Sequence, residues 1–363
     1  MRWYPDRKEL HLNNRDYPVF AQCGEHPRSP RECWPIIKIE GPVPVPSKLR
    51  YVMLVSGHGG AYFWMHYRSI LALARNHDRY YREVSIPKRS GGYRVLALPG
   101  EKLAEQQRLF KYLILSGIPA DPHACAYERG RSIRMCAEPH VGKSRLIHLD
   151  IKDFFGSITQ SMVRRMLMEY GGYSAGVAKL FSDLCCYKGH LPQGTCTSPQ
   201  LSNLCFRRCD ELIAEYAEYW GWNYTRYSDD LYFSAPRQLN LDGYTSDRLI
   251  QRVSEILRSE GFRLNKKKTS VRCRGQAQRV LGISVNPKIQ ATRDYRRDVR
   301  QEYYYWSKFG RDALTARRHS DSYLSYLHAL LGKVSYILYL NPKDSFFKKA
   351  RITLNYMIMR EKT

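Results

Sequence analysis

Three aspartates are the residues of this chain whose types and spacing best suit chemistry. Asp229 and Asp230 are adjacent in the run Tyr224–Ser234, where two β-rich segments meet at a bend. Asp150 closes an earlier apolar run, Arg145–Asp150, so strand ends from two parts of the chain can bring carboxylates to one point. Clustered carboxylates need a neutralising cation, and Mg²⁺ prefers a few carboxylate oxygens together with water and substrate phosphate. The pattern predicts a divalent-metal site that also touches phosphate.

The charge balance indicates a polyanionic partner. The chain has 363 residues with 59 Lys and Arg against 34 Asp and Glu, a formal net charge of +25, and the excess is spread along its length. Its hydrophobic content of 43% fits a globular protein and excludes a disordered one. Because aromatic residues make up 13% and can stack on bases, nucleic acid is favoured over a membrane surface. A basic surface that binds nothing is the alternative.

Cysteine usage and the N-terminus bear on location. The 10 cysteines include no Cys-x-x-Cys pair and lie on core-like or helical segments, which predicts reduced, buried thiols. Residues 1–8 lack an apolar signal segment, and no run approaches the ~20 apolar residues of a membrane span. We expect a cytoplasmic protein without membrane contact.

Periodicity and turn residues predict the elements that position the aspartates. The proline-dense stretch 41–46 indicates an extended arm, and Gly91 and Gly92 lie in the turn of a basic hairpin. In the strand that ends at Asp150, period-two geometry turns this acid away from the apolar row of Ile147 and Leu149. Ser198 is expected to cap a long helix. The expected helices are 61–76, 103–114, 159–186 in stretches, 199–219, 245–260 and most of 293–363; the expected strands lie within 83–96, 146–151, 224–234 and 269–272.

Three sequence motifs follow one another along the chain: Asp150-Ile151-Lys152-Asp153-Phe154-Phe155, then Leu191–Pro199, then Tyr227-Ser228-Asp229-Asp230. Together they resemble the palm motifs of reverse transcriptases, closest to the bacterial retron and group II intron lineage, over residues 86–341. The resemblance implies an α+β right-hand polymerase with fingers, a ferredoxin-like palm of β-α-β-β-α-β order and a helical thumb. The implied limits are 1–60 for the N-terminal arm, 61–144 with part of 160–198 for the fingers, 145–290 for the palm and 291–363 for the thumb.

The resemblance assigns the carboxylates to metal-dependent nucleotidyl transfer from deoxynucleoside triphosphates. It implies that Asp150 and Asp229 ligate two Mg²⁺ ions, that Asp230 completes the cluster, and that Ile151 contacts metal. Solvated acids at a hairpin tip are the alternative for an Asp-Asp pair. Among the lysines at 266–268, Lys268 matches the residue that can protonate the leaving pyrophosphate, although any of the three could belong to a solvated charge run.

Five further positions match nucleotide-binding residues of the family. Lys88 and Arg94 on the basic hairpin match residues that clamp the triphosphate. Phe155 matches the aromatic under the incoming sugar, where a 2′-hydroxyl would clash; a core role for the ring is the alternative. Gln193 and Gly194 match the loop that supports nucleotide and template, or else form a plain turn into the next helix.

Weaker matches concern RNA. Residues 136–140 and 280–282 correspond to the retron segments Asn-Ala-x-x-His and Val-Thr-Gly, each altered at one position. His140 is expected either to contact RNA or to be a satisfied histidine at a helix end. The RNA-binding candidates are Arg131, His140, Arg279 and Lys333.

Membership in the retron group would imply a wider function. The enzyme would copy a structured noncoding RNA, prime from a 2′-hydroxyl within it, yield a branched RNA–DNA product (msDNA), and act with an effector or toxin protein in anti-phage defence. Rival interpretations are another defence-associated or intron-derived reverse transcriptase, and a non-catalytic RNA-binding protein on the same fold. The intact acid triad argues against the last, because like charges without a metal destabilise a fold.

Overall fold

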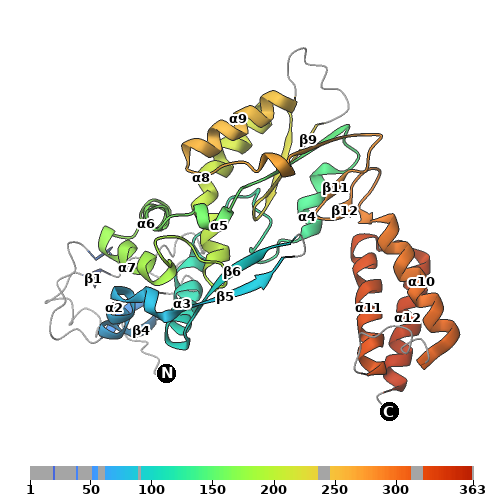
Figure 1. The fold of residues 1–363 in the computed structure, drawn as a ribbon, viewed down its shortest axis with the longest axis horizontal. Coiled ribbons are helices and arrows are strands. Elements are labelled where there is room, and N and C mark those ends of the chain that lie inside the picture. The colour runs from blue at the N-terminus through green and yellow to red at the C-terminus, as the bar shows by residue number, and fades with distance from the viewer. Residues whose placement is uncertain are drawn as a thin grey trace.

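The computed structural model describes residues 19–20, 38–39, 51–55, 62–88, 91–235, 246–311 and 322–361. The predicted arm, residues 1–60, therefore lies outside the described residues except for three short strands, and its role stays a prediction. Two antiparallel pairs involve this region: β1 (Val19–Phe20) with β2 (Lys38–Ile39), and β3 (Tyr51–Val55) with β4 (Tyr62–His66). Figure 1 shows these elements at the opposite end of the molecule from the C-terminal helices.

The predicted fingers begin with a strand where we expected a helix. Helix α2 covers Tyr67–Arg75, so the prediction of a helix from residue 61 was wrong over residues 62–66, which pair with β3. Local periodicity does not reveal a distant strand partner, which explains the error. The predicted basic hairpin is confirmed as β5 (Tyr81–Pro87) and β6 (Tyr93–Pro99), followed by α3 (Glu101–Leu113).

The central sheet carries the aspartates. Its strands are β7 (Arg145–Asp150), β8 (Asn223–Tyr227), β9 (Asp230–Ala235) and β10 (Ser270–Cys273), in the order β10-β7-β9-β8 with every neighbouring pair antiparallel. With the helices that connect them, this is the β-α-β-β-α-β arrangement. The predicted ferredoxin-like palm is confirmed.

Helices cover one face of this sheet, and the other face carries the acids. Ile147 and Leu149 of β7 and Phe233 of β9 are fully buried in one core with residues of the long helix α8 and of α9. Figure 1 shows α8 and α9 on the same side of the strands. The palm and fingers helices are α4 (Ile133–Ala137), α5 (Phe154–Ser157), α6 (Gln160–Glu169), α7 (Ala175–Cys185), α8 (Ser198–Tyr219) and α9 (Ser246–Ser259).

The start of α8 differs from the expectation. Ser198 is not its cap but its first residue, and its backbone N–H donates to Thr195 Oγ1 at 3.1 Å. Thr195, two residues before the N-cap position Thr197, therefore supplies the oxygen that accepts from this N–H.

The C-terminal part is helical, as predicted, and its described residues form three helices. A small sheet of β11 (Arg279–Val280), β12 (Ile283–Ser284) and β13 (Gln290–Ala291) leads from the palm into α10 (Arg293–Phe309), α11 (Tyr323–Leu340) and α12 (Ser345–Arg360). Figure 1 shows the bundle set apart from the palm. Arg134 of α4 bridges to it, because its Nη1 donates to the carbonyl of Tyr339 at 2.9 Å.

Two whole-chain expectations can be checked over the described part. The eight cysteines there are free, and Cys125, Cys136, Cys185, Cys186 and Cys209 are buried. Cys196 and Cys205 are half-buried and Cys273 is exposed, so the prediction of buried thiols was wrong for Cys273. None of the helices described is long and apolar enough to cross a membrane.

Candidate active site

Strand pairing brings the three aspartates to one end of the sheet. Asp150, the last residue of β7, is the direct partner of Asp230, the first residue of β9. Ile151 N–H donates to the carbonyl of Asp229 at 2.9 Å, which extends the pairing by one residue. The sequence-based prediction that separate strand ends supply the acids to one point agrees with this geometry.

The turn between β8 and β9 holds Asp229. Tyr227 pairs with Asp230 and leaves Ser228 and Asp229 as the two turn residues. Ser228 adopts a left-handed φ of 59°, a conformation that costs a non-glycine residue energy and persists only where neighbours enforce it. Tyr127 OH donates to Ser228 Oγ at 2.9 Å. The turn is thus fixed from the side chain as well as the backbone.

A buried ion pair fixes the same turn from behind. Arg226, with no exposed surface, donates from Nε and Nη2 to the two carboxylate oxygens of Asp210 at 2.8 and 2.6 Å. Its Nη1 donates to Asn203 Oδ1 and to the carbonyl of Ser228, both at 3.1 Å. Burial alone would lower the pKa of Arg226, but the Asp210 carboxylate raises it above its ordinary value, so the guanidinium stays charged. We did not predict this network; an arginine three residues before Asp229 was its only signal.

The three carboxylates lie close enough to repel one another, and a bound cation would relieve this repulsion. Burial, followed by the charges of Asp230 and Asp150, raises the pKa of Asp229 above its ordinary value. Asp150 is instead neutralised locally: Lys268 Nζ lies 2.7 Å from its Oδ2, and Asn265 Nδ2 donates to its Oδ1 at 3.0 Å. The hydrogen bond to Asp150 raises the pKa of Lys268, and Asp229 and Asp230 add to this.

The oxygen atoms at this site are of the kind that bind a divalent cation, but Lys268 would have to move to make room for one. Carboxylate oxygens of Asp150, Asp229 and Asp230, with the carbonyl of Ile151, are the hard oxygen ligands that Mg²⁺ takes. Over the residues described, however, no three His, Cys, Asp or Glu side chains are already arranged to hold a metal. The Lys268 ammonium lies against Asp150, so metal binding requires this lysine to withdraw.

His148 is a member of the site that sequence reasoning missed. Its Nε2 lies 2.7 Å from Asp230 Oδ1, and its ring stacks on Tyr232 with centroids 4.8 Å apart. It stands two residues before Asp150 on the same strand, so period-two geometry puts both side chains on one face. That spacing was the available signal.

The hairpin and the loop predicted to bind nucleotide lie together. Ala97 N–H of β6 donates to the carbonyl of Gln193 at 2.8 Å. Gly194 has φ of +116°, and a Cβ there would meet the Ala97 carbonyl oxygen at a tight 3.1 Å, so both the backbone conformation and the close approach favour glycine. Arg94 is exposed on β6, and Lys88 closes the hairpin turn through its N–H to Gly92 O at 2.9 Å. Their contact with a triphosphate stays a prediction.

Phe155 lies between core and surface. It is half-buried against the palm core, and its ring meets that of Phe154 edge-on with centroids 5.5 Å apart. Packing against a buried neighbour would fix the ring while part of it stays accessible. Phe155 can therefore pack in the core and also present its edge to the sugar of an incoming nucleotide.

The RNA-binding prediction for His140 was wrong. The side chain has no exposed surface, and its Nδ1 and Nε2 lie 2.7 Å from Ser234 Oγ and 2.8 Å from Thr225 Oγ1. Burial lowers its pKa to about 3, so the ring is neutral. His140 links the end of the α4 segment to strands β8 and β9 through hydrogen bonds of both ring nitrogens. This agrees with the alternative interpretation, a histidine whose hydrogen bonds are satisfied at a helix end.

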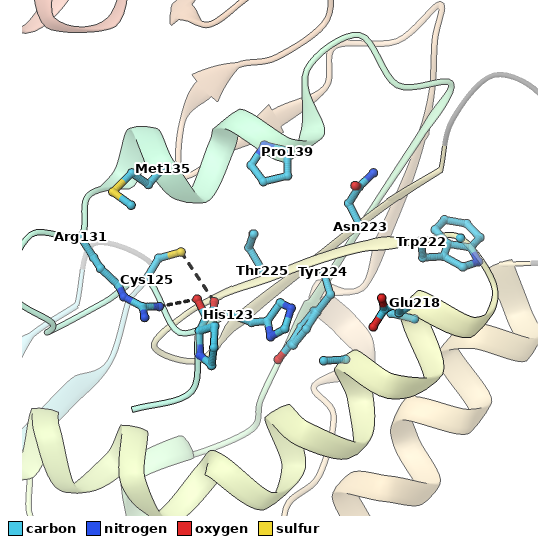
Figure 2. Close-up of a pocket in the computed structure, with 14 residues that line it drawn as sticks. His123, Cys125, Arg131, Met135, Pro139, Glu218, Trp222, Asn223, Tyr224 and Thr225 are labelled. Carbon is cyan, nitrogen blue, oxygen red and sulfur yellow. Dashed lines mark hydrogen bonds between the residues drawn. The ribbon is translucent and has the colours of Figure 1, made fainter. Parts of the chain in front are cut away.

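The other RNA candidates stay predictions, two of them with competing partners. Arg131 borders a cavity of about 680 Å³ beside β8 (Figure 2). Its Nη1 donates to the carbonyls of residues 121, 122 and 124. Lys333 of α11 donates to both carboxylate oxygens of the buried Glu302, at 3.0 and 2.8 Å. Arg279 on β11 is exposed.

Comparison with known proteins identifies the family. The model of the reverse transcriptase (RNA-dependent DNA polymerase) family matches residues 86–285, which include all three aspartates. The retron Ec86 reverse transcriptase of Escherichia coli is 30% identical over 231 residues, covering 63% of this chain and 70% of that protein. The chain belongs to the retron-type reverse transcriptases. Reverse transcriptases generally use divalent metal ions.

Two further retron enzymes also match this reverse transcriptase. The retron Mx65 reverse transcriptase of Myxococcus xanthus is 36% identical over 273 residues, covering 70% of this chain and 62% of the relative. The retron Mx162 enzyme of the same organism is 32% identical, and 51% of its length is covered. The match thus spans about half to two thirds of these two proteins. Telomerase from Candida albicans, solved with a fragment of telomeric RNA, aligns with 85% of this chain and 64% of its own at 11% identity and a TM-score of 0.43.

Proposed function

We propose that this chain is an RNA-directed DNA polymerase that copies RNA into DNA from deoxynucleoside triphosphates. The observation that carries the proposal is the convergence of Asp150, Asp229 and Asp230 at one end of a ferredoxin-like sheet, within the segment that matches the reverse transcriptase family. Burial, followed by the neighbouring charges of Asp230 and Asp150, raises the pKa of Asp229, and a perturbed carboxyl in a cluster of acids is typical of a functional site.

Each residue near this centre has a role that its position supports. Two Mg²⁺ ions, when bound, would activate the primer hydroxyl and stabilise the leaving pyrophosphate. The carboxylates of Asp150, Asp229 and Asp230 and the Ile151 carbonyl would hold these ions. Lys268, once it leaves Asp150, carries a proton at Nζ that it can give to the pyrophosphate.

The hairpin and the palm select and hold the nucleotide. Lys88 and Arg94 bind the triphosphate, and the loop at Gln193 and Gly194 supports nucleotide and template while it fixes the hairpin to the palm. The edge of Phe155 excludes a 2′-hydroxyl.

The finer function follows the retron relatives. The template is a dedicated structured noncoding RNA, which supplies the priming 2′-hydroxyl, and the product is a branched RNA–DNA molecule that acts with an effector protein in anti-phage defence. The enzyme works in the cytoplasm, with arm, fingers, palm and thumb over 1–60, 61–144 with part of 160–198, 145–290 and 291–363. The net charge of +25 suits such a polyanionic partner.

The test has two readouts. The purified chain should extend a DNA primer on an RNA template with dNTPs and Mg²⁺, and should stop when the metal is chelated. Sequencing of co-purified nucleic acid, before and after treatment with a debranching enzyme, should reveal one RNA joined to DNA through a 2′-linkage. Primer extension without a branched product would support the polymerase function but refute the retron-specific function. RNA binding without primer extension would favour the non-catalytic alternative.

A further inference from the structure

Two cysteines meet beside the edge strand of the palm sheet. Cys125 belongs to the loop at residues 121–127, and its backbone N–H donates to the carbonyl of Arg226 on β8 at 2.7 Å. Cys136 belongs to α4, and its Sγ lies 3.3 Å from Thr225 Oγ1 on the same strand. Both thiols are free and buried.

Strand register puts both side chains on one face of β8. Ala124 forms a parallel bridge with Arg226, so these two residues point to the same face of the sheet. Cys125 is one residue further along and therefore shares the opposite face with Thr225, the residue that Cys136 contacts. The two thiols lie within hydrogen-bonding distance of each other. Little movement is therefore needed to bring the sulfurs to the ~2.05 Å separation of a disulfide.

One of the two thiols is open to small reagents, and the other is not. Cys125 lines the cavity of about 680 Å³ beside β8 (Figure 2), whereas Cys136 has no exposed surface. A hydrogen bond from the Cys136 thiol, together with the charges of Arg131 and Arg226, holds the pKa of Cys125 below its ordinary value, although burial opposes this. Because the thiolate is the reactive form of cysteine, Cys125 is placed to react first, and Cys136 is placed to attack the product.

The loop that carries Cys125 also supports the turn between β8 and β9. Tyr127, two residues further on, donates from its OH to Ser228 Oγ at 2.9 Å. Arg226, whose carbonyl accepts the Cys125 N–H, donates from Nη1 to the Ser228 carbonyl at 3.1 Å. A movement of Cys125 toward α4 would shift both supports of this turn, which contains Asp229.

We propose that Cys125 and Cys136 form a redox modification site, at which hydrogen peroxide produces a reversible disulfide that slows primer extension. The Cys125 thiolate attacks one peroxide oxygen and the O–O bond breaks, so that Cys125 becomes a sulfenic acid and hydroxide leaves and takes up a proton to form water. The Cys136 sulfur then attacks the sulfenic sulfur, the S–O bond breaks, and the Cys136 thiol proton leaves with the hydroxide as a second water. One peroxide is thus reduced to water while two thiols are oxidised to one disulfide. A dithiol reductant reverses the reaction by thiol–disulfide exchange.

Peptide mapping of the full chain tests the site itself. The reduced protein is treated with hydrogen peroxide, free thiols are blocked with N-ethylmaleimide, and the protein is digested with trypsin. Cleavage yields the peptides 112–129 and 135–143, each of which contains a single cysteine. Mass spectrometry should find these two peptides linked with the loss of two hydrogens, and dithiothreitol should separate them. Blocked or over-oxidised cysteines in both peptides, without a link between them, would overturn the proposal.

Two single variants test the order of the steps. In Cys136→Ser the sulfenic acid has no thiol to attack it, so dimedone should label Cys125 after peroxide treatment. In Cys125→Ser, Cys136 should stay unlabelled, because it is buried and the hydrogen bond to Cys125 and burial raise its pKa. Labelling of Cys136 alone would contradict the assignment of Cys125 as the residue that reacts first.

Primer extension on an RNA template measures the consequence of the modification. Peroxide should slow the wild type about tenfold, because a displacement of about 1 Å at a catalytic site can cost up to about 10²-fold, and dithiothreitol should restore the rate. The double variant Cys125→Ser with Cys136→Ser should resist peroxide, whereas the control Cys273→Ser, which removes an exposed thiol from β10, should be slowed like the wild type. Equal inhibition of the double variant, or an unchanged rate in the disulfide form, would overturn the regulatory effect. Because peptide mapping needs no catalysis, a chain that forms the disulfide but never extends a primer would refute the polymerase function and not the modification site.

Discussion

The buried pair of Arg226 and Asp210 gives the sharpest prediction about stability. Arg226→Met leaves the Asp210 carboxylate, which has no exposed surface, without the guanidinium charge and its hydrogen bonds of 2.8 and 2.6 Å; only the hydrogen bond from Tyr224 OH, at 2.7 Å, remains. Breaking a buried pair in this way costs about 3–5 kcal/mol, because an uncompensated charge stays buried. Asp210→Leu strands the guanidinium and should cost a similar amount. In the double variant no charge is stranded, so the two losses should overlap by at least about 2 kcal/mol.

The assay is urea unfolding of the wild type, both single variants and the double variant. The double variant should unfold at a higher urea concentration than either single variant. It should nevertheless extend primers poorly, because the Ser228 carbonyl loses the 3.1 Å hydrogen bond that steadies the turn of Asp229. Strictly additive losses of stability would refute the reasoning that the two charges stabilise each other, and normal extension by the double variant would refute the role of Arg226 in positioning the turn.

Three further changes test separate parts of the site. Because burial and then repulsion from Asp230 raise the pKa of Asp229, its ionisation weakens the folded state as pH rises above 3.8. Asp229→Asn should therefore raise the Tm in EDTA by about 2–4 °C at pH 7.5 and leave it unchanged at pH 3.5; an equal gain at both pH values would contradict this. His140→Ala should lower stability by about 2–4 kcal/mol in urea unfolding, because Thr225 and Ser234 lose a buried partner, and leave RNA affinity unchanged once folded; weakened RNA binding by the folded variant would restore the rejected contact. Phe155→Ala should admit ribonucleotides in single-nucleotide incorporation; unchanged sugar selectivity would assign the ring to the core alone.

Local pattern predicted most elements of the palm. Alternation along β7 separated Ile147 and Leu149 from Asp150, and the structure buries the apolar pair beneath the helices. The hairpin of Asp229 and Asp230 was also readable from its two β-rich arms. These features depend on residues close in sequence, where period-two and 3.6-residue patterns carry the information.

Apart from the convergence of Asp150 with Asp229 and Asp230, contacts between distant segments were not predicted. The strand at 62–66 forms because β3 lies beside it, and Asn265 reaches Asp150 across more than a hundred residues. His140 was open to two interpretations, because burial by β8 and β9 is a property of the assembled fold. Residue type restricts what such a side chain can do, but its partners follow only from the tertiary arrangement.

The most direct measurement of the central claim uses the two turn aspartates. We expect Asp229→Ala with Asp230→Ala to abolish Mg²⁺-dependent dNTP incorporation on an RNA template while the variant binds the same RNA with the affinity of the wild type. Incorporation at the wild-type rate by this double variant would contradict the assignment of the carboxylate cluster as the catalytic centre.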